Sequence, residues 1–118
     1  MLRNRLRNDD PSEAVFDALG NPVRRQILQR LGAGPLSVGD LAAAFTVSRP
    51  AISRHLAQLA EAGLVAHKAD GTRNLYALEP RGFAATRQWL DSFWNEAEAR
   101  LRLVAENLAE PKPGGGNG

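Results

Sequence analysis

Arginine, serine and histidine side chains gather in one short stretch of this chain, which contains Ser48, Arg49, Ser53, Arg54 and His55. A guanidinium can donate two parallel hydrogen bonds to the acceptors on a guanine edge, and hydroxyls bind bases or phosphates. The chain has no cysteine and only two histidines. No cysteine nucleophile, metal cluster or glycine-rich phosphate loop can be assembled from it. These residue types favour DNA recognition without a cofactor over catalysis.

The local pattern predicts a helix that presents these side chains on its outward face. Ser48 is the predicted N-cap, and Pro50 is tolerated in a first turn because the N–H that it lacks would be unpaired there. Gly63 ends the helix. At about 100° per residue Arg54 lies opposite an apolar face formed by Ile52, Leu56 and Leu59. Small polar side chains with arginine suit a major-groove helix, and Arg49 lies in the first turn, where it can fork onto a guanine.

A shorter helix precedes this one. Ser37 is its predicted N-cap, and apolar residues at helical spacing continue to Phe45, near which the helix is expected to end. Thr46 and Val47 then form the turn. The two segments together predict a helix-turn-helix. A polar helix face is also common on surface helices that are only solvated, so the residues that follow matter for the interpretation.

A β-hairpin is predicted directly after the helix pair. Residues 64–68 form a short strand, Asp70-Gly71 is a strong turn signal, and residues 74–78 form the return strand. A helix-turn-helix followed by a hairpin is a winged helix. Basic and hydroxyl side chains at a hairpin tip are well placed to contact phosphates or the minor groove of DNA, but hairpin turns are also polar simply because they are solvated. The residues at or near this tip are Lys68, Thr72 and Arg73.

Two further helices are expected before this unit and one long helix after it. Ser12 is predicted to cap the first, which Gly20 ends, and Asn21-Pro22 starts the second, which Gly32 ends. The expected fold is mainly α with a small β-hairpin, in the order α-α-α-α-β-β-α. The expected segments are a flexible basic arm at 1–10, a winged helix-turn-helix domain with terminal dimerisation helices at 11–109, and a disordered tail at 110–118.

The final helix, from about residue 81 to 108, is expected to pair with a second copy of the chain. Its apolar residues alternate spacings of four and three, the pattern of a helix that packs against another helix. Aromatic residues widen this stripe and are typical interface anchors, although some of them could equally cover the domain's own core. The predicted dimer contacts are Val15, Phe16, Leu90, Phe93, Trp94, Ala97, Leu101 and Val104.

Four segments carry a family resemblance: FDALGNPVRRQILQRL at 16–31, LSVGDLAAAF at 36–45, VSRPAISRHLAQLAEAGLV at 47–65 and DGTRNLYAL at 70–78. In these segments the chain resembles the ArsR family of small bacterial winged-helix repressors, which is named for arsenic and metal sensing. The resemblance implies a homodimer that represses transcription by binding an inverted repeat over a promoter. It also implies that the residues facing DNA include Arg49, Ser53, Arg54 and His55.

His55 has two interpretations that the sequence does not separate. It lies nearer the apolar face of its helix than Arg54 does. Its ring either donates a hydrogen bond to a phosphate or takes part in the packing of the helix.

A regulatory metal is not expected. Relatives that sense arsenic or soft metals place two cysteines in the segment matching 36–41, where this chain has Ser37 and Gly39. Without cysteine, thiolate coordination by the protein is impossible. Relatives that sense zinc-like metals use carboxylates and histidines of the last helix. With Asp91 in register with the first of these, the others fall on residues that are not usual zinc ligands, namely Phe93, Val104 and Asn107.

Composition agrees with a small DNA-binding domain. With 118 residues, of which 43% are hydrophobic, the chain can build one small core that gains from dimerisation. The net charge is +2, and the arginines of the predicted reading unit are separated from the glutamates near the end. No stretch approaches the roughly 18 apolar residues of a membrane span, and the start lacks a hydrophobic export segment. A cytoplasmic protein without a membrane partner is expected.

Function and control leave alternatives open. A winged helix can also serve as a protein-protein interaction module without specific DNA binding, in which the aromatic last helix docks a larger partner. Control could come from a small-molecule effector, from the protein's own concentration or from a partner that removes it from DNA. In the effector alternative, the pocket is near Trp89, Phe93 and Trp94; nothing in the sequence chooses among the three kinds of control. The operator sequence, the target genes and the choice between repression and activation are not visible in the sequence.

Overall fold

A computed structural model describes residues 10–109. Backbone contacts divide the chain into two compact units, of which the first ends at Thr86 and the second begins at Arg87. The predicted tail at 110–118 lies outside the described residues, and so does the predicted basic arm except for Asp10. Within residues 10–109 no helix is long and apolar enough to cross a membrane.

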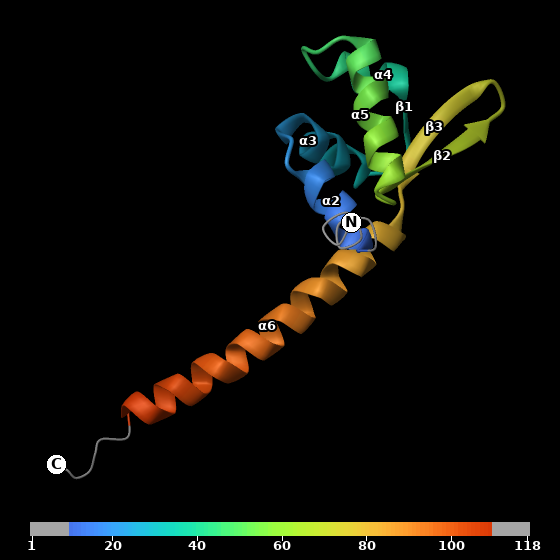
Figure 1. Cartoon of the computed structure of the whole chain (residues 1–118). Coiled ribbons are helices and arrows are strands. Elements are labelled where there is room, and N and C mark those ends of the chain that lie inside the picture. Colours follow the sequence, from blue (N-terminus) through green and yellow to red (C-terminus); the bar gives the residue numbers. More distant parts are fainter. Residues whose placement is uncertain (1–9, 110–118) are drawn as a thin grey trace, which may run out of the picture. The chain divides into compact units, whose positions relative to one another are not determined.

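Five helices and three short strands follow one another along the described part of the chain (Figure 1). In order they are α2 (Pro11–Leu19), α3 (Pro22–Leu31), β1 (Leu36–Ser37), α4 (Val38–Ala43), α5 (Arg49–Glu61), β2 (Val65–Asp70), β3 (Arg73–Leu78) and α6 (Pro80–Ala109). The predicted order of four helices, a hairpin and a last helix is confirmed. The structure adds β1 to it.

The helix starts follow from capping side chains. Asn21, Ser37 and Ser48 each accept a hydrogen bond from a backbone N–H in the first turn of their helix, as predicted. The prediction that Ser12 caps the first helix is wrong. Asp10 is the N-cap, and the buried Ser12 donates its hydroxyl to the Asp10 carboxylate at 2.6 Å. The helix starts earlier because Pro11 occupies its first position, where a proline is already set in the helical φ.

Two boundaries differ from the predicted ones by one or two residues. Helix α4 ends at Ala43, so Phe45 lies in the turn and not at the helix end. Strand β2 continues to Asp70, which pairs with Arg73. The two-residue turn is therefore Gly71-Thr72 and not Asp70-Gly71. Gly71 has a φ of +66°, the conformation that the first central position of a tight hairpin turn requires.

The wing is a three-stranded antiparallel sheet in the order β1-β3-β2. Leu36 lies opposite Tyr76 and Ser37 lies opposite Leu75, so the residue that caps α4 also pairs with the hairpin. Strand β1 leaves no signal in the sequence because two residues are too few to show alternation. This short strand attaches the start of α4 to the wing.

The core of the first unit lies between α2, α3, α4, α5 and the base of the hairpin. Its largest fully buried hydrophobic side chains are Val15, Ile27, Leu41, Ile52, Leu56, Leu59 and Leu64. The apolar face predicted for the reading helix is thus fully buried. Burying side chains of this size contributes about 1.5–3 kcal/mol each, which holds α5 firmly against the domain.

The junction into α6 needs a glycine. A Cβ at Gly82 would lie 2.5 Å from the carbonyl oxygen of Ala62, which is closer than real contacts allow. The N–H of Gly82 donates to the carbonyl of Gly63 at 2.8 Å. Gly63 itself has a φ of +76°, so the predicted stop after α5 is confirmed. The first turns of α6 are therefore fixed to the end of α5.

Candidate nucleic-acid interface

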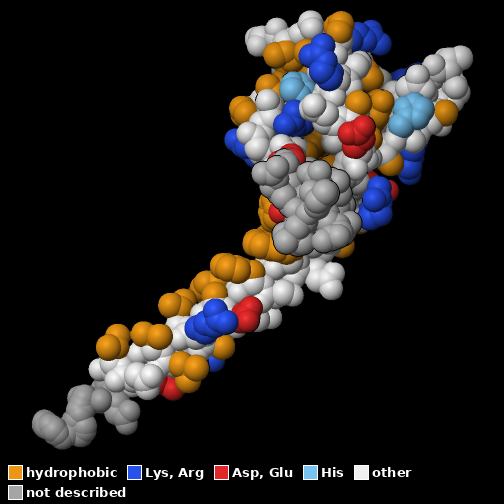
Figure 2. All heavy atoms as spheres, viewed as in Figure 1, with side chains coloured by type: hydrophobic (Ala, Val, Ile, Leu, Met, Phe, Trp, Pro, Cys, Tyr) orange, Lys and Arg blue, Asp and Glu red, His pale blue; other side chains and the backbone are white. Residues whose placement is uncertain are grey.

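The outward face of α5 is polar and open to solvent. Arg49, Ser53 and Arg54 are exposed, while Ser48 caps the helix with its side-chain oxygen. Among the described residues, no acidic group pairs with Arg49 or Arg54. Figure 2 shows Lys and Arg side chains on the face over α5. A rigid helix with unpaired guanidinium groups on its solvent side suits binding to an anionic polymer.

Arg49 lies against the start of α4. Its Nη1 atom is 3.8 Å from the position that a Cβ on Gly39 would occupy. The side chain lines a hollow of about 300 Å³ together with Thr72, Arg73 and Asn74 of the wing. The first turn of α5 and the hairpin tip therefore form one surface, although they are more than 20 residues apart in the sequence.

Arg73 is tied to the helix-turn-helix by an ion pair. Its Nη2 atom lies 3.3 Å from a carboxylate oxygen of Asp40 in α4, and the two side chains are 58% and 54% exposed. An exposed pair of this kind contributes at most about 1 kcal/mol. Its effect here is mainly on position, because it holds the wing arginine beside α4. The sequence placed Arg73 at the tip but gave no sign of this partner.

The remaining wing residues are exposed but do not all lie at the tip. Thr72 is in the turn, whereas Lys68 lies opposite Leu75 in the middle of the hairpin. His67 Nε2 and Asn74 Oδ1 are 2.9 Å apart. The His67 ring meets Tyr76 edge to face at 5.3 Å. These contacts stiffen the hairpin that carries Lys68 and Thr72.

Arg24 connects three helices beneath the reading face. Its Nε donates to the Ala18 carbonyl at 2.7 Å and its Nη2 to the Asp17 carbonyl at 3.1 Å, both at the end of α2. Its Nη1 reaches α5, where it donates to Gln58 Oε1 and lies 3.3 Å from His55 Nδ1. Contacts between residues 31 and 34 positions apart leave no local signal.

This contact fixes the role of His55. A guanidinium only donates, so Nδ1 must accept and the ring proton sits on Nε2. Burial lowers the pKa of His55, and the positive charges of Arg24 and Arg54 lower it further. The contact with Arg24 supports the packing interpretation of His55, and the phosphate contact stays a prediction. Nδ1 takes part in helix packing, and the Nε2–H is left as a donor.

The second unit is the rest of α6, and it exposes a row of large apolar side chains. Figure 2 shows hydrophobic side chains along this helix. Trp89 and Phe93 stack with their ring centroids 5.5 Å apart. The exposed members of the predicted stripe are Leu90, Phe93, Trp94, Leu101 and Val104, and Ala97 is half-buried. This is the apolar surface that the predicted dimer requires.

Two predicted dimer contacts lie in the first unit. Phe16 is half-buried on α2. Val15 has no exposed surface and packs in the core, so its prediction as a residue that touches a second copy is wrong. The physical reason is that Val15 and Ala18 lie on the face of α2 that packs into the core of its own domain.

The described residues contain no group of three or more His, Asp or Glu side chains placed to hold a metal ion. Ser37 caps α4 with its side-chain oxygen, and Gly39 lies beneath the Arg49 guanidinium. Ser37 therefore has a structural role in starting α4, and Gly39 leaves room for the Arg49 side chain.

A helix-turn-helix with an exposed basic face, followed by a stiff hairpin, defines a winged helix-turn-helix protein of the DNA-binding class. Residues 19–68 match the family described as a helix-turn-helix domain. The matched segment runs from the end of α2 into β2 and so contains the helix-turn-helix and the first part of the hairpin.

Curated relatives point to a narrower class. The chain is 48% identical over 85 residues to the HTH-type transcriptional regulator Rv2034 of Mycobacterium tuberculosis, covering 72% of this chain and 79% of that protein. It is 33% identical to the transcriptional repressor SdpR of Bacillus subtilis, covering 74% and 97%. These relatives are transcriptional regulators, which agrees with the expectation that the chain is not an enzyme.

Solved structures with a similar fold also belong to transcriptional regulators. An ArsR-like transcriptional regulator from Rhodococcus sp. superposes with a TM-score of 0.76 at 31% identity, covering 86% of this chain and 95% of that one. A homodimeric winged helix-turn-helix DNA-binding domain from Mycobacterium bovis gives a TM-score of 0.59 at 28% identity, covering 92% and 91%. The chain belongs to the ArsR family of winged helix-turn-helix transcriptional regulators.

Proposed function

We propose that this protein is a homodimeric transcriptional repressor that binds an inverted repeat in a promoter and acts in the cytoplasm. The observation that carries the proposal is the division of α5 into two faces. Ile52, Leu56 and Leu59 have no exposed surface, while Arg54 and Ser53 on the other side are free to meet DNA. Repression is supported by the relative named as a repressor, and it follows physically when a bound dimer blocks polymerase.

Within this interface, base reading and phosphate binding fall to different side chains. Arg54 and Ser53 project from the middle of α5 and are proposed to contact base edges. Arg49 lies beside Thr72 and Arg73 at the hollow between α5 and the wing, a position that suits a phosphate better than the guanine suggested by the sequence. Lys68 and the capping Ser48 add contacts to the backbone.

His55 is proposed to bind a phosphate through its Nε2–H. Its Nδ1 is held by Arg24, so the ring is already oriented before DNA arrives. A neutral imidazole donates one hydrogen bond there.

The dimer follows from the second unit. Leu90, Trp94 and Leu101 are 48%, 52% and 58% exposed, which is unusual for side chains of this size in a soluble protein unless they meet a partner. The similar domain from Mycobacterium bovis is homodimeric, which supports a second copy as that partner. A two-fold axis then places two α5 helices on half-sites centred roughly 10 base pairs apart, or a multiple of that.

Repression is proposed to be independent of metal. Ser37 and Gly39 lie in the segment where relatives that sense arsenic or soft metals carry two cysteines, and this chain has no cysteine. The proposal therefore predicts that a chelator leaves DNA binding unchanged.

The test is binding of the purified, chelator-treated protein to its own upstream DNA and to a random duplex across a salt series. Specific binding with two chains per site, and a steep salt dependence, is the expected result. Weak binding that is equal for both duplexes would contradict the proposal. If such a protein were also monomeric, it would instead fit a protein-protein interaction module.

A further inference from the structure

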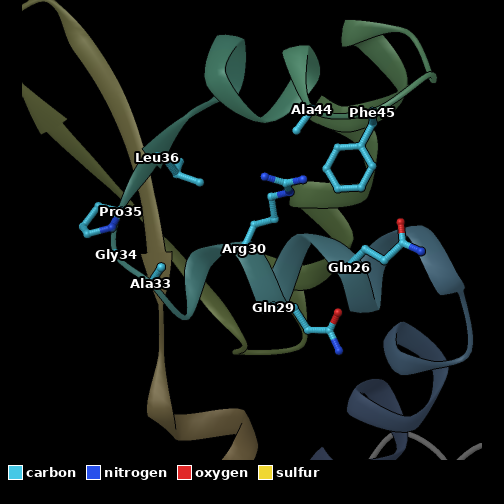
Figure 3. Close-up of a pocket in the computed structure, with 9 residues that line it drawn as sticks. All are labelled: Gln26, Gln29, Arg30, Ala33, Gly34, Pro35, Leu36, Ala44 and Phe45. Atoms are coloured by element: carbon cyan, nitrogen blue, oxygen red, sulfur yellow. The ribbon is translucent and has the colours of Figure 1, made fainter.

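A pocket of about 620 Å³ opens in the first unit between α3, the segment leading into β1 and the end of α4. Figure 3 shows the side chains around it. The volume lies within the range of about 300–1,000 Å³ of pockets that hold small organic molecules. It lies apart from the arginines of the proposed DNA-reading face, since none of Arg49, Arg54 and Arg73 lines it.

Arg30 is the one charged residue among those that line the pocket. Its guanidinium lies 6.0 Å from the centroid of the Phe45 ring, which orients the group by a cation–π contact. The three ion pairs found within residues 10–109 belong to other arginines, namely Arg73, Arg100 and Arg102. Arg30 therefore offers its positive charge to an occupant.

The rest of the lining is apolar or amidic. Figure 3 shows Arg30 reaching from α3 toward Ala44 and Phe45, with the Leu36 side chain directed into the same space. Gln26 and Gln29 lie on α3 at the edge of the pocket and supply neutral donors and acceptors. An anion with a flat or branched hydrocarbon body would meet a charge partner at one end and apolar walls elsewhere.

We propose that this pocket binds a small organic carboxylate and that its occupancy changes the affinity of the protein for DNA. The second half of this proposal rests on the proposed function. Ala44 is the C-cap of α4, and Phe45 begins the turn that leads to the N-cap of α5. A ligand that packs on Phe45 contacts the connection between the two helices of the helix-turn-helix. A ligand that binds the free and the DNA-bound forms unequally must alter DNA affinity by the same factor.

The first experiment tests the pocket without DNA. Benzoate is titrated into the ¹⁵N-labelled protein, and backbone amide shifts are followed, with the neutral isostere benzamide as the comparison ligand. Benzoate is expected to shift the amides of Arg30, Leu36 and Phe45 in a saturable way. Benzamide should bind about tenfold more weakly or not at all, since it lacks the charge that pairs with the guanidinium.

Variants of α3 separate charge from fold. Arg30→Gln should weaken benzoate binding by about tenfold or more, whereas Arg30→Lys keeps the charge and should retain part of it. Arg25→Gln removes a charge from the same helix outside the pocket, where Arg25 donates to the Leu19 carbonyl at 2.6 Å, and should bind benzoate as the wild type does. Equal binding of benzamide, or unchanged binding by Arg30→Gln, would overturn the site.

The second experiment measures DNA affinity with and without saturating benzoate. A change in affinity for the wild type, and none for Arg30→Gln, is expected. Arg30→Gln should bind DNA normally when no ligand is present. A loss of DNA affinity in Arg30→Gln without ligand would assign Arg30 to the DNA contact and overturn the pocket's role. Benzoate binding without any effect on DNA affinity would overturn the regulation. A protein that binds benzoate but no DNA would contradict the proposed function and leave the site standing.

Discussion

Helix α5 buries its apolar face, whereas the part of α6 after Thr86 leaves its apolar face open. Leu56 and Leu59 have no exposed surface, but Trp94 and Leu101 are 52% and 58% exposed. Both helices show apolar residues at helical spacing in the sequence. Apolar periodicity in the sequence therefore does not distinguish a helix that packs on its own domain from one whose apolar face is exposed.

The two helices get their stability from different contacts. Helix α5 is held by its own domain, so its position should not depend on protein concentration. The second part of α6 has little to pack on within its own unit, whereas most of a helix's stability in a protein comes from packing its apolar face. Its order should depend on a second copy of the chain, and therefore on concentration.

The largest effect is expected from Leu56→Ala in the core of the first unit. Removing a fully buried leucine side chain should cost about 2–5 kcal/mol of the free energy of unfolding. Denaturant titration at two protein concentrations would measure it. The loss should be similar at both, because the contact is within one chain. A loss that vanished at high concentration would contradict the division between the two regions.

Leu101→Glu should act on association. A carboxylate in the middle of the apolar stripe should raise the dimer dissociation constant at least about 100-fold, as substitution of an interface hot spot does. Sedimentation equilibrium would measure it.

Leu103→Glu is the matched control for this change. Leu103 is two residues away, is similarly exposed at 61%, and projects about 200° from Leu101 around the helix. It should leave the dissociation constant near that of the wild type. If both variants dissociated equally, the stripe would not define the interface.

Arg54→Ala should have an intermediate effect, on specificity. We expect a loss of about 1–3 kcal/mol at the cognate site and a smaller loss on random duplex. Fluorescence anisotropy with both duplexes would measure it. Arg102→Ala is the control, since it removes the same charge from an exposed ion pair with Glu98. Wild-type discrimination by Arg54→Ala would remove that side chain from the reading face.

The smallest effect is expected from pH. The pKa of His55 is lower in the folded chain than in the unfolded one, because burial and the charges of Arg24 and Arg54 disfavour the protonated ring. Its contribution to stability is therefore full above the unfolded pKa of about 6.5 and is lost as pH falls through the folded pKa. Unfolding at pH 7.5 and 5.0 should show a smaller acid loss for His55→Gln than for the wild type. Equal losses would assign the acid sensitivity elsewhere.

Much of the fold could be predicted because its signals are local. A cap such as Ser48 two residues before Pro50, and a positive-φ glycine such as Gly63, act through neighbouring backbone groups. The cap of α2 was missed although its signal was present. Asp10 before Pro11 repeats the arrangement of Asn21 before Pro22, and proline at the first helical position was the better guide.

The candidate site was predicted as a set of residues but not as a surface. Nothing local indicates that Arg73 pairs with Asp40, that Arg49 lies beside the wing, or that Arg24 holds His55. These contacts join segments far apart in the chain and exist only after the core has formed. The pocket at Arg30 likewise gives no sequence signal, because its lining residues come from three separate segments between residues 26 and 45.

The pairing of β1 with β3 and the ion pair of Arg73 with Asp40 both fasten the wing to α4. These two contacts restrain the position of the hairpin relative to α4 and the helix that follows it. If the proposed function holds, the spacing between the base-contacting side chains of α5 and the phosphate-contacting side chains of the wing is set before DNA binds. Duplexes whose grooves are narrowed or widened by their own sequence should be rejected even where every contacted base is correct.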